Sequence, residues 1–517
     1  MASEDGIYRT LTPRFDEAGS SAVSVPRRTG SGWARLVPSW PWIVALLALA
    51  RALASPAALL HDADTYLHIA VGRWIMAHGA LPTADPFSHT FAGAHWVPGE
   101  WLAEVALAAV YRLAGWGGIV VLAALCFAVA AGGLTRFLLW RLPPLPAVIA
   151  SLAGAMLVLP HLVARPHIVA LPLLVAWCGA LLSARDENRA PPWAVLPVMV
   201  LWANLHGSFM FGLALAGFLA AEAVLRSTPR LTYLVEARRW GGFVVAAVVA
   251  ALLTPNGPAT LVQPFRLLQM PALQSGFAEW MPANLGAFPG LEAWLLGALA
   301  LGFACGVRLP AFRLALLVGL AHMALAHVRH ADLLGLVGPL AVAGALGPAI
   351  GEMLRPAAAS PLLRVAATLA RPARLPAIAM MLALAVAASL PTLRHPPLRS
   401  GDATTPDAAL AAAARMGLTG PVFNSEAFGG YLVFCGVPVF IDGRIEMYGN
   451  DFLAAYLAAE HGDEAALARL LDRYHIGWTL VQTQSPAAVA LDRLPGWRRT
   501  YADDRAVIHV RSEPAAH

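Results

Sequence analysis

Residues 61–104 read HDADTYLHIAVGRWIMAHGALPTADPFSHTFAGAHWVPGEWLAE, a stretch that is acidic and rich in histidine and tryptophan. It lies between the apolar segment Trp42–Ala58 and a long series of further apolar segments. Connections between packed helices are short as a rule, and a long connection is commonly a functional element. The pattern therefore predicts a site in this loop, at the surface of a membrane.

The composition of the whole chain indicates a polytopic α-helical membrane protein. Of the 517 residues, 58% are hydrophobic and 13% are charged, and the mean hydropathy is +0.62. Soluble domains carry about 25% charged residues. The apolar segment Trp101–Ala114 contains Glu104 and Arg112, so we expect it to lie at the interface. About 11 spans then remain, and about 13 would satisfy the same topology, with the two ends of the chain on opposite sides.

Arginine gathers in the N-terminal tail and in short connections, among them 136–141, 185–189 and 226–239. Arginine-rich short loops lie on the cytoplasmic side, which leaves the large loop 59–100 on the outer side. We predict a disordered cytoplasmic tail over 1–39 and a transmembrane domain over 40–391. Hydropathy then drops, and 392–517 is predicted to be a soluble domain in the periplasm, outside a bacterial inner membrane.

Short apolar runs alternate with helical spacing in this last domain, which predicts an α/β layer. The expected strands are Pro421–Asn424, Val437–Asp442, Ile476–Gln482 and Val507–Arg511, and the expected helices are Phe452–Glu460 and Glu464–Tyr474. The domain has no phosphate-binding glycine loop of the P-loop or dinucleotide type. A nucleotide or nucleic-acid partner is therefore not expected.

Candidate chemistry begins with Asp62, Asp64 and His68. A carboxylate at a membrane mouth can act as a general base, orient a metal ion or hold sugar hydroxyls. Asp64 and His68 lie one helical turn apart, on one face. The alternative is a capping aspartate at the start of a short helix. Glu100 is a further carboxylate near the end of the same loop.

Polar residues at membrane depth are costly and indicate function or helix pairing. Arg51 lies inside the first apolar segment, Arg165 and His167 flank a proline between two segments, and Asn204 and His206 interrupt another. Arg51 has the chemistry to meet a lipid-linked phosphate, or it snorkels or pairs with a loop carboxylate. Histidines are frequent here, but HExxH and CxxC are absent, so a divalent metal is a possibility without a defined ligand set.

Two segments of the last domain combine aromatic, glycine and charged residues after expected strands. They contain Tyr431 in the first and Asp442, Arg444 and Glu446 in the second. Turns at strand ends commonly contact ligands in α/β layers, and aromatic and carboxylate groups together suit a sugar. We therefore regard these residues as candidates for acceptor binding. The alternative is turn chemistry with a structural pair of Asp442 and Arg444.

The motifs together resemble the GT-C superfamily of integral-membrane glycosyltransferases. The resemblance extends from about residue 40 to about 511 and is to the bacterial branch akin to the protein O-mannosyltransferases and aminoarabinose transferases. It rests on the loop pattern Asp64…His68…Asp85-Pro-Phe-Ser…Trp96…Glu100-Trp, on Arg165–His167, on Trp202–Gly207, on Gly429–Leu432 and on Ile441–Gly449. Many relatives have adjacent Asp-Glu in this loop, whereas this chain has Asp-Ala-Asp, so either Asp62 or Asp64 can hold the role of that pair.

The resemblance implies transfer of a sugar from a polyprenyl-phosphate-linked donor to a lipid, glycan or protein acceptor at the outer face of the membrane. It implies that Asp64 or Asp62 is the base, with Arg165, His167 and His206 near the donor phosphate. No nucleotide cofactor is expected. A transporter or flippase of lipid-linked glycans, or a non-catalytic glycan-assembly subunit, are the alternatives from other classes.

Overall fold

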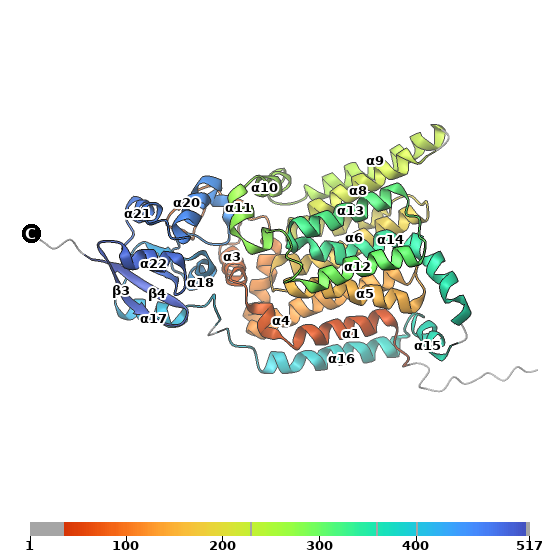
Figure 1. Cartoon of the computed structure of the whole chain (residues 1–517), viewed down its shortest axis with the longest axis horizontal. Coiled ribbons are helices and arrows are strands. Elements are labelled where there is room, and N and C mark those ends of the chain that lie inside the picture. The colour runs from red at the N-terminus through yellow and green to blue at the C-terminus, as the bar shows by residue number, and fades with distance from the viewer. Residues whose placement is uncertain (1–35, 228–229, 358–359, 400–401, 513–517) are drawn as a thin grey trace, which may run out of the picture.

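The computed structural model describes residues 36–227, 230–357, 360–399 and 402–512. A helical bundle forms one end of the molecule and a small sheet domain forms the other, with α3, α10 and α11 between them (Figure 1). The predicted class, a polytopic helical protein with a C-terminal α/β domain, is confirmed. The predicted disordered tail falls on residues 1–39, which lie almost entirely outside the described residues.

The bundle and its outer connections contain sixteen α-helices as numbered. They are α1 (Trp40–Leu53), α2 (Pro56–Leu60), α3 (Asp64–His78), α4 (Trp101–Leu138), α5 (Pro144–Val158), α6 (Pro166–Asp186), α7 (Leu196–Leu205), α8 (Phe209–Leu225), α9 (Arg230–Ala251), α10 (Ala259–Leu268), α11 (Pro271–Gly276), α12 (Pro289–Ala304), α13 (Ala311–Ala326), α14 (Ala331–Leu354), α15 (Pro361–Leu369) and α16 (Leu375–Arg394).

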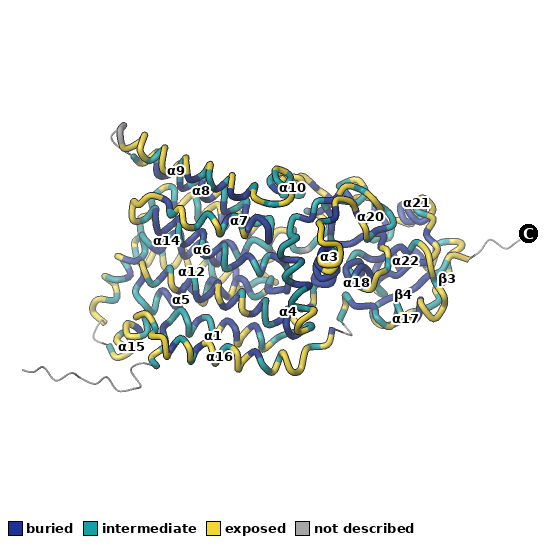
Figure 2. Tube along the Cα trace, turned by 180° about the vertical axis from the view of Figure 1, so that it is seen from behind, coloured by how far each residue is buried: buried dark blue, intermediate teal, exposed yellow. Residues whose placement is uncertain are grey.

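Among the described residues, 5 helices are long and apolar enough to cross a membrane, and further apolar helices are shorter. The number of spans therefore stays a prediction. In α4 and α6, 67% of the most apolar window is buried, against 17% in α16, which lies on the outside of the bundle (Figure 2). The first two are core helices, whereas most of α16 is free to face lipid.

Helix α4 includes the segment that we expected at the interface. Trp101–Ala114 is its first part, and the helix breaks at Gly115, where φ is 58° and ψ is −151°. Glycine tolerates this left-handed region because it has no Cβ. The break sets the segment with Glu104 and Arg112 apart from the apolar span that follows it.

The C-terminal domain packs helices against a four-stranded sheet of order β1-β2-β4-β3. Its strands are β1 (Val422–Asn424), β2 (Trp478–Gln482), β3 (Trp497–Ala502) and β4 (Ala506–Arg511), and its helices are α17 (Asp407–Arg415), α18 (Glu426–Phe434), α19 (Ile445–Tyr448), α20 (Asn450–Glu460), α21 (Glu464–Arg473) and α22 (Pro486–Arg493). β1 is parallel to β2, and the other two pairings are antiparallel. The two expected helices and three of the four expected strands are confirmed.

The fourth expected strand, Val437–Asp442, is wrong, because this apolar run pairs with the first loop instead of the sheet. The Val439 N–H donates to the carbonyl of Phe87, and the His89 N–H donates to that of Val439. The sheet contains β3 in its place, an edge strand with two exposed arginines whose polarity hid it from the apolar pattern. The first loop is therefore joined to the C-terminal domain by backbone pairing.

Glycine allows helix α18 to approach the start of α3. A Cβ on Gly430 would lie 2.3 Å from the backbone oxygen of Ala63, and one on Gly443 would lie 2.1 Å from Oδ1 of Asp64. Real Cβ atoms do not approach so closely. The domain therefore sits directly on the loop that contains Asp62 and Asp64.

We expect Gly430→Ala to lower the thermal stability of the purified protein, because the added methyl meets backbone that cannot yield easily. Overpacking of this kind costs about 1–3 kcal/mol. Gly477→Ala is the matched control, since a Cβ there meets nothing within 4 Å. Thermal unfolding in detergent measures both variants. Equal melting temperatures for the two would show that the contact between α18 and α3 is loose.

Candidate active site

Two aspartates open helix α3. The Asp64 N–H donates to Oδ1 of Asp62 over 2.8 Å, a local bond by which aspartate ends a turn. Helix α3 begins at Asp64, so both carboxylates lie at its N-terminal end, where the helix dipole favours negative charge. His68 follows one turn later on the same face.

Arg165 lies between these two carboxylates and a third one from a distant loop. Its Nη1 is 3.2 Å from Oδ2 of Asp62 and 3.3 Å from Oε2 of Glu279, and its Nη2 is 2.7 Å from Oδ2 of Asp64. Pro166 begins α6 and keeps Arg165 extended, with φ −119° and ψ 165°. The side chain of Arg165 therefore pairs with carboxylates at the start of α3 and at Glu279.

A second group of charges adjoins the first. Nδ1 of His68 is 3.3 Å from Oε1 of Glu104, and its Nε2 is 3.9 Å from Oε2 of Glu100. Nε2 of His206 is 3.3 Å from Oε1 of Glu100. The Ser208 N–H donates to Nδ1 of His206, which leaves Nε2 as the protonated nitrogen of the neutral ring. Glu100 therefore lies between two imidazoles.

Burial and charge shift the pKa values of Asp62 and Asp64 in opposite directions. Burial raises the pKa of Asp62, but Arg165 and the bond from the Asp64 N–H outweigh it and hold the pKa below its usual value. Burial also raises the pKa of Asp64, and the lowering effect of Arg165 is countered by the charge of Asp62, so this pKa stays above its usual value. Asp62 is thus the more acidic member of the pair.

The pKa values of Glu100, His68 and His206 in the second group are shifted as well. Burial raises the pKa of Glu100 to about 7, against the lowering effect of His68. Burial lowers the pKa of His68, but the bond to Glu104 and the charges of Glu100 and Glu104 outweigh it and raise the pKa overall. Burial lowers the pKa of His206 far below its usual value. His68 therefore keeps its proton to a higher pH than His206, which is the neutral imidazole at neutral pH.

An apolar groove of about 1230 Å³ opens beside this second group. Its wall is made by α7, α9 and the start of α4, and it includes Trp101 and Asn204. The Trp101 Nε1–H donates to Oδ1 of Asn204 over 2.9 Å. Trp101 directly follows Glu100, and Asn204 lies two residues before His206. The lining of the groove thus includes the residue directly after Glu100 and the residue two positions before His206.

His167 lies near His206, with the two ring centroids 6.1 Å apart and with its Nε2 3.1 Å from the carbonyl of His161. The structure does not bring Arg51 to either group. Its side chain is exposed at the end of α1, and its one described bond, to Ser55, spans 3.5 Å. Arg51 is therefore not assigned to the site.

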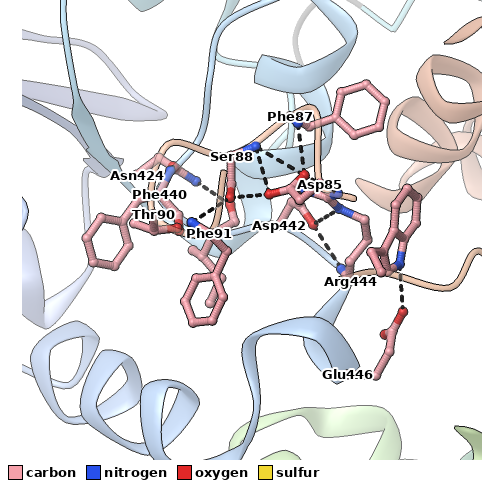
Figure 3. Close-up of polar contacts among 12 residues, drawn as sticks. Asp85, Phe87, Ser88, Thr90, Phe91, Asn424, Phe440, Asp442, Arg444 and Glu446 are labelled. Carbon is pink, nitrogen blue, oxygen red and sulfur yellow. Dashed lines mark hydrogen bonds and ion pairs between the residues drawn. The ribbon is translucent and has the colours of Figure 1, made fainter. Parts of the chain in front are cut away.

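The candidate acceptor residues of the second segment join the C-terminal domain to the first loop (Figure 3). Nη1 of Arg444 is 2.6 Å from Oδ1 of Asp85, and its Nη2 is 2.7 Å from Oδ2 of Asp442. Both carboxylate side chains are 0% exposed. The guanidinium also lies over the rings of Phe87 and Trp96. Asp442 and Arg444 thus form the structural pair that was the alternative reading, extended to Asp85 of the first loop, and their contact with an acceptor stays a prediction.

Glu446 and Tyr431 differ in position. Oε1 of Glu446 accepts bonds from Nε1 of Trp96 and Nε2 of Gln263, and its charge contributes to the raised pKa of Glu100. Glu446 thus belongs near the charged groups. Tyr431 lies against Tyr66 with ring centroids 5.1 Å apart, in an aromatic contact between α18 and α3.

Three acidic residues and one arginine of the site were missed. Glu279 pairs with Arg165 and, over 3.1 Å, with Arg329, whose guanidinium lies over Trp280. Glu104 looked like a reason to place its helix at the interface. The pKa of Glu426, the first residue of α18, is raised by burial and then by the charges of Asp64 and Asp62. The sequence holds a signal for Glu104, which lies one turn after Glu100, and for Arg329, which lies in a short segment with His327 and His330.

The carboxylates of Asp62, Asp64 and Glu279 are ligands of the type that divalent metals prefer, but all three face the guanidinium of Arg165. A cation would have to displace that group. Within the described ranges, no three His, Cys, Asp or Glu side chains are arranged to hold a metal ion. The arrangement does not fit a metal as it stands, and a divalent metal stays a prediction.

We expect Glu100→Gln to raise the melting temperature at pH 8 and to change it little at pH 4.5. The pKa of Glu100 is about 7 when folded and returns toward 4.5 on unfolding. Between these values the folded chain binds more protons than the unfolded chain, so the stability falls as the pH rises. Thermal unfolding at both pH values measures this, with the exposed Glu292→Gln as control. The same shift at both pH values would contradict the raised pKa.

Comparisons with known proteins bear on the fold. No protein-family model matches the chain, and no curated protein is similar to it in sequence. Among solved structures, it is similar to the Archaeoglobus fulgidus oligosaccharyltransferase AglB in complex with an inhibitory peptide and a dolichol-phosphate. The TM-score is 0.54 at 13% identity, over 92% of this chain and 75% of that one.

The apo form of the Archaeoglobus fulgidus oligosaccharyltransferase gives a TM-score of 0.50 at 13% identity, over 85% of this chain and 69% of that one. ArnT from Cupriavidus metallidurans is a further match, with a TM-score of 0.44 at 15% identity, over 92% of this chain and 99% of that one. The two oligosaccharyltransferase structures, at TM-scores of 0.50 and 0.54, show that the chain shares their fold.

Proposed function

We propose that the chain is a glycosyltransferase that moves a sugar from a polyprenyl-phosphate-linked donor to a hydroxyl of a lipid, glycan or protein. The observation that carries the proposal is an apolar groove whose lining residues Trp101 and Asn204 are close in sequence to the ion pair of Glu100 and His206. A lipid-linked donor needs an apolar surface for its polyprenyl chain and polar groups for its phosphate. The fold supports the same class, because the neighbour AglB was solved with a dolichol-phosphate.

In this reaction the polyprenyl chain lies in the groove and the phosphate lies at its charged end. The Nε2–H of the neutral His206 lies 3.3 Å from Oε1 of Glu100, so the phosphate would replace Glu100 as its partner, with Asn204 and His167 nearby. Preorganised donors of this kind stabilise the charge that develops on a leaving phosphate. Both Nη atoms of Arg165 are engaged by carboxylates. Arg165 therefore acts on the phosphate through its positive charge and not through a hydrogen bond.

The acceptor hydroxyl loses its proton to a carboxylate, and Asp64 is the candidate for that role. Its pKa lies above that of Asp62, so it is the better proton acceptor of the pair. Asp62 is held by both Arg165 and the Asp64 N–H, which suits a residue that orients its neighbour. The side of the site with Asp64 lies under the C-terminal domain, so we place the acceptor there and the domain on the periplasmic side of an inner membrane.

We expect Asp64→Asn to lower the rate of sugar transfer by about 10²–10⁴-fold, the usual contribution of a general base, and Asp62→Asn to lower it less. The assay follows transfer from a panel of radiolabelled polyprenyl-phosphate sugars in membranes without competing transferases. Asp451→Asn, in an exposed position on α20, is the control. An Asp64→Asn enzyme as fast as wild type would remove Asp64 from the role of base.

We expect Ala246→Trp to raise the KM for long-chain donors while leaving that for donors with one or two isoprene units unchanged. Ala246 lines the groove, so an indole there would fill space that the polyprenyl chain needs. Leu299→Trp, on an exposed position of α12 outside the lining, is the control. An equal effect on short and long donors would show that the groove does not hold the chain.

A further inference from the structure

The connection between α16 and α17 contains a buried arginine that the proposed reaction has not used. Arg399 follows the last apolar helix by five residues and is 4% exposed. The connection links the helical bundle to the C-terminal domain. An arginine in such a segment would ordinarily point into water, so its burial calls for a specific set of partners.

The partners of Arg399 connect this segment to the first loop. Its Nη2 donates to the backbone carbonyl of Asp62 over 2.9 Å and to Oγ1 of Thr404 over 3.2 Å. Its Nε donates to Oδ2 of Asp402 over 3.1 Å. The guanidinium carbon lies 3.9 Å from the ring centroid of Tyr66. One side chain thus contacts Asp62, two residues before helix α3, and a ring within that helix.

The segment closes on itself around this guanidinium. Oδ1 of Asp402 accepts bonds from Oγ1 of Thr404 and Oγ1 of Thr405, over 2.7 and 2.8 Å. The Tyr66 hydroxyl lies 3.0 Å from Oγ1 of Thr405. Burial raises the pKa of Asp402, but these hydroxyl bonds and Arg399 outweigh it and hold the pKa below its usual value. The carboxylate is therefore charged at neutral pH and fixes the orientation of Arg399.

The bond to the Asp62 carbonyl acts on the site through the backbone. The Asp62 carboxylate accepts the Asp64 N–H and pairs with Arg165, so the turn at 62–64 sets the place of both carboxylates. Arg399 holds that turn by its backbone carbonyl. Nη1 of Arg399 is buried without a partner in the described part of the chain, an unfavourable feature of the kind that is retained where geometry matters.

We propose that Arg399 is a positioning residue that fixes the Asp62–Asp64 turn and couples it to the connection with the C-terminal domain. The proposal rests on the proposed sugar transfer for its effect on rate, but not for its effect on the turn. Lysine cannot replace Arg399, because only the planar guanidinium offers donors to Asp402 and Asp62 at once while stacking on Tyr66.

The test compares Arg399→Lys and Arg399→Ala with Arg394→Ala, an exposed arginine at the end of α16. Hydrogen exchange by mass spectrometry follows the amides of residues 61–67 in the full-length protein. Steady-state kinetics on the same preparations separate kcat from KM for the polyprenyl-phosphate donor. Asp402→Asn provides a second way to loosen Arg399 if the alanine variant fails to fold.

We expect faster exchange confined to 61–67 and to the connection at 402–405 in both Arg399 variants and in Asp402→Asn, with kcat lowered about 10–100-fold, since small misplacements of reacting groups have effects of this size. KM for the donor should stay at the wild-type value, because the groove is untouched. Arg394→Ala should match wild type in both measurements. Exchange that rises across the whole protein, or a changed KM with unchanged kcat, would overturn the proposal and leave Arg399 a general support of the fold.

The two proposals fail in different ways. Unchanged exchange at 61–67 in the Arg399 variants overturns the role of Arg399, whether or not the wild type transfers sugar. Local exchange that rises while the wild type transfers sugar from no donor in the panel overturns the glycosyltransferase function. It supports Arg399 as the residue that holds the turn.

Discussion

The arrangement of the charged groups between the helical bundle and the C-terminal domain depends on the ion pairs of Arg165. It pairs with Asp62 and Asp64 at the start of α3 and with Glu279 in a distant loop. Carboxylates brought together under a protein domain repel one another and lose hydration, and removing one partner of such a group costs about 3–5 kcal/mol. One arginine at the start of α6 therefore determines where three segments of the chain can meet.

The C-terminal domain completes this arrangement. Its glycines allow backbone to approach Ala63 and Asp64, and Arg444 ties it to Asp85 of the first loop by a fully buried ion pair. The domain thereby covers much of the surface of Asp64, whose side chain is 16% exposed, and lower exposure to water strengthens its charge interactions. The same burial explains why carboxyl groups of the site, such as Asp64 and Glu426, have raised pKa values.

Composition and apolar length predicted the helical bundle, because lipid contact demands long apolar helices whatever their partners. The loop residues Asp62, Asp64, His68 and Glu100 were also predicted, because charged residues stand out in an apolar chain. Glu279 and Arg399 could not be, since each acquires its role from a partner more than 100 residues away. Val437–Asp442 has the pattern of a strand, but its backbone partner is the first loop, and spacing alone does not reveal the partner.

An acidic residue beside an anionic phosphate looks unfavourable, yet Glu100 directly precedes Trp101 of the groove lining, where the proposed reaction puts the phosphate. Its pKa of about 7 resolves the difficulty. Near neutral pH the carboxyl is protonated in a large share of molecules, and a phosphate nearby would raise that share by adding negative charge. The protonated carboxyl donates a hydrogen bond where the ionised one would repel. In the proposed reaction Glu100 thus binds the phosphate of the donor, whereas Asp64, which pairs with Arg165, accepts the proton of the acceptor hydroxyl.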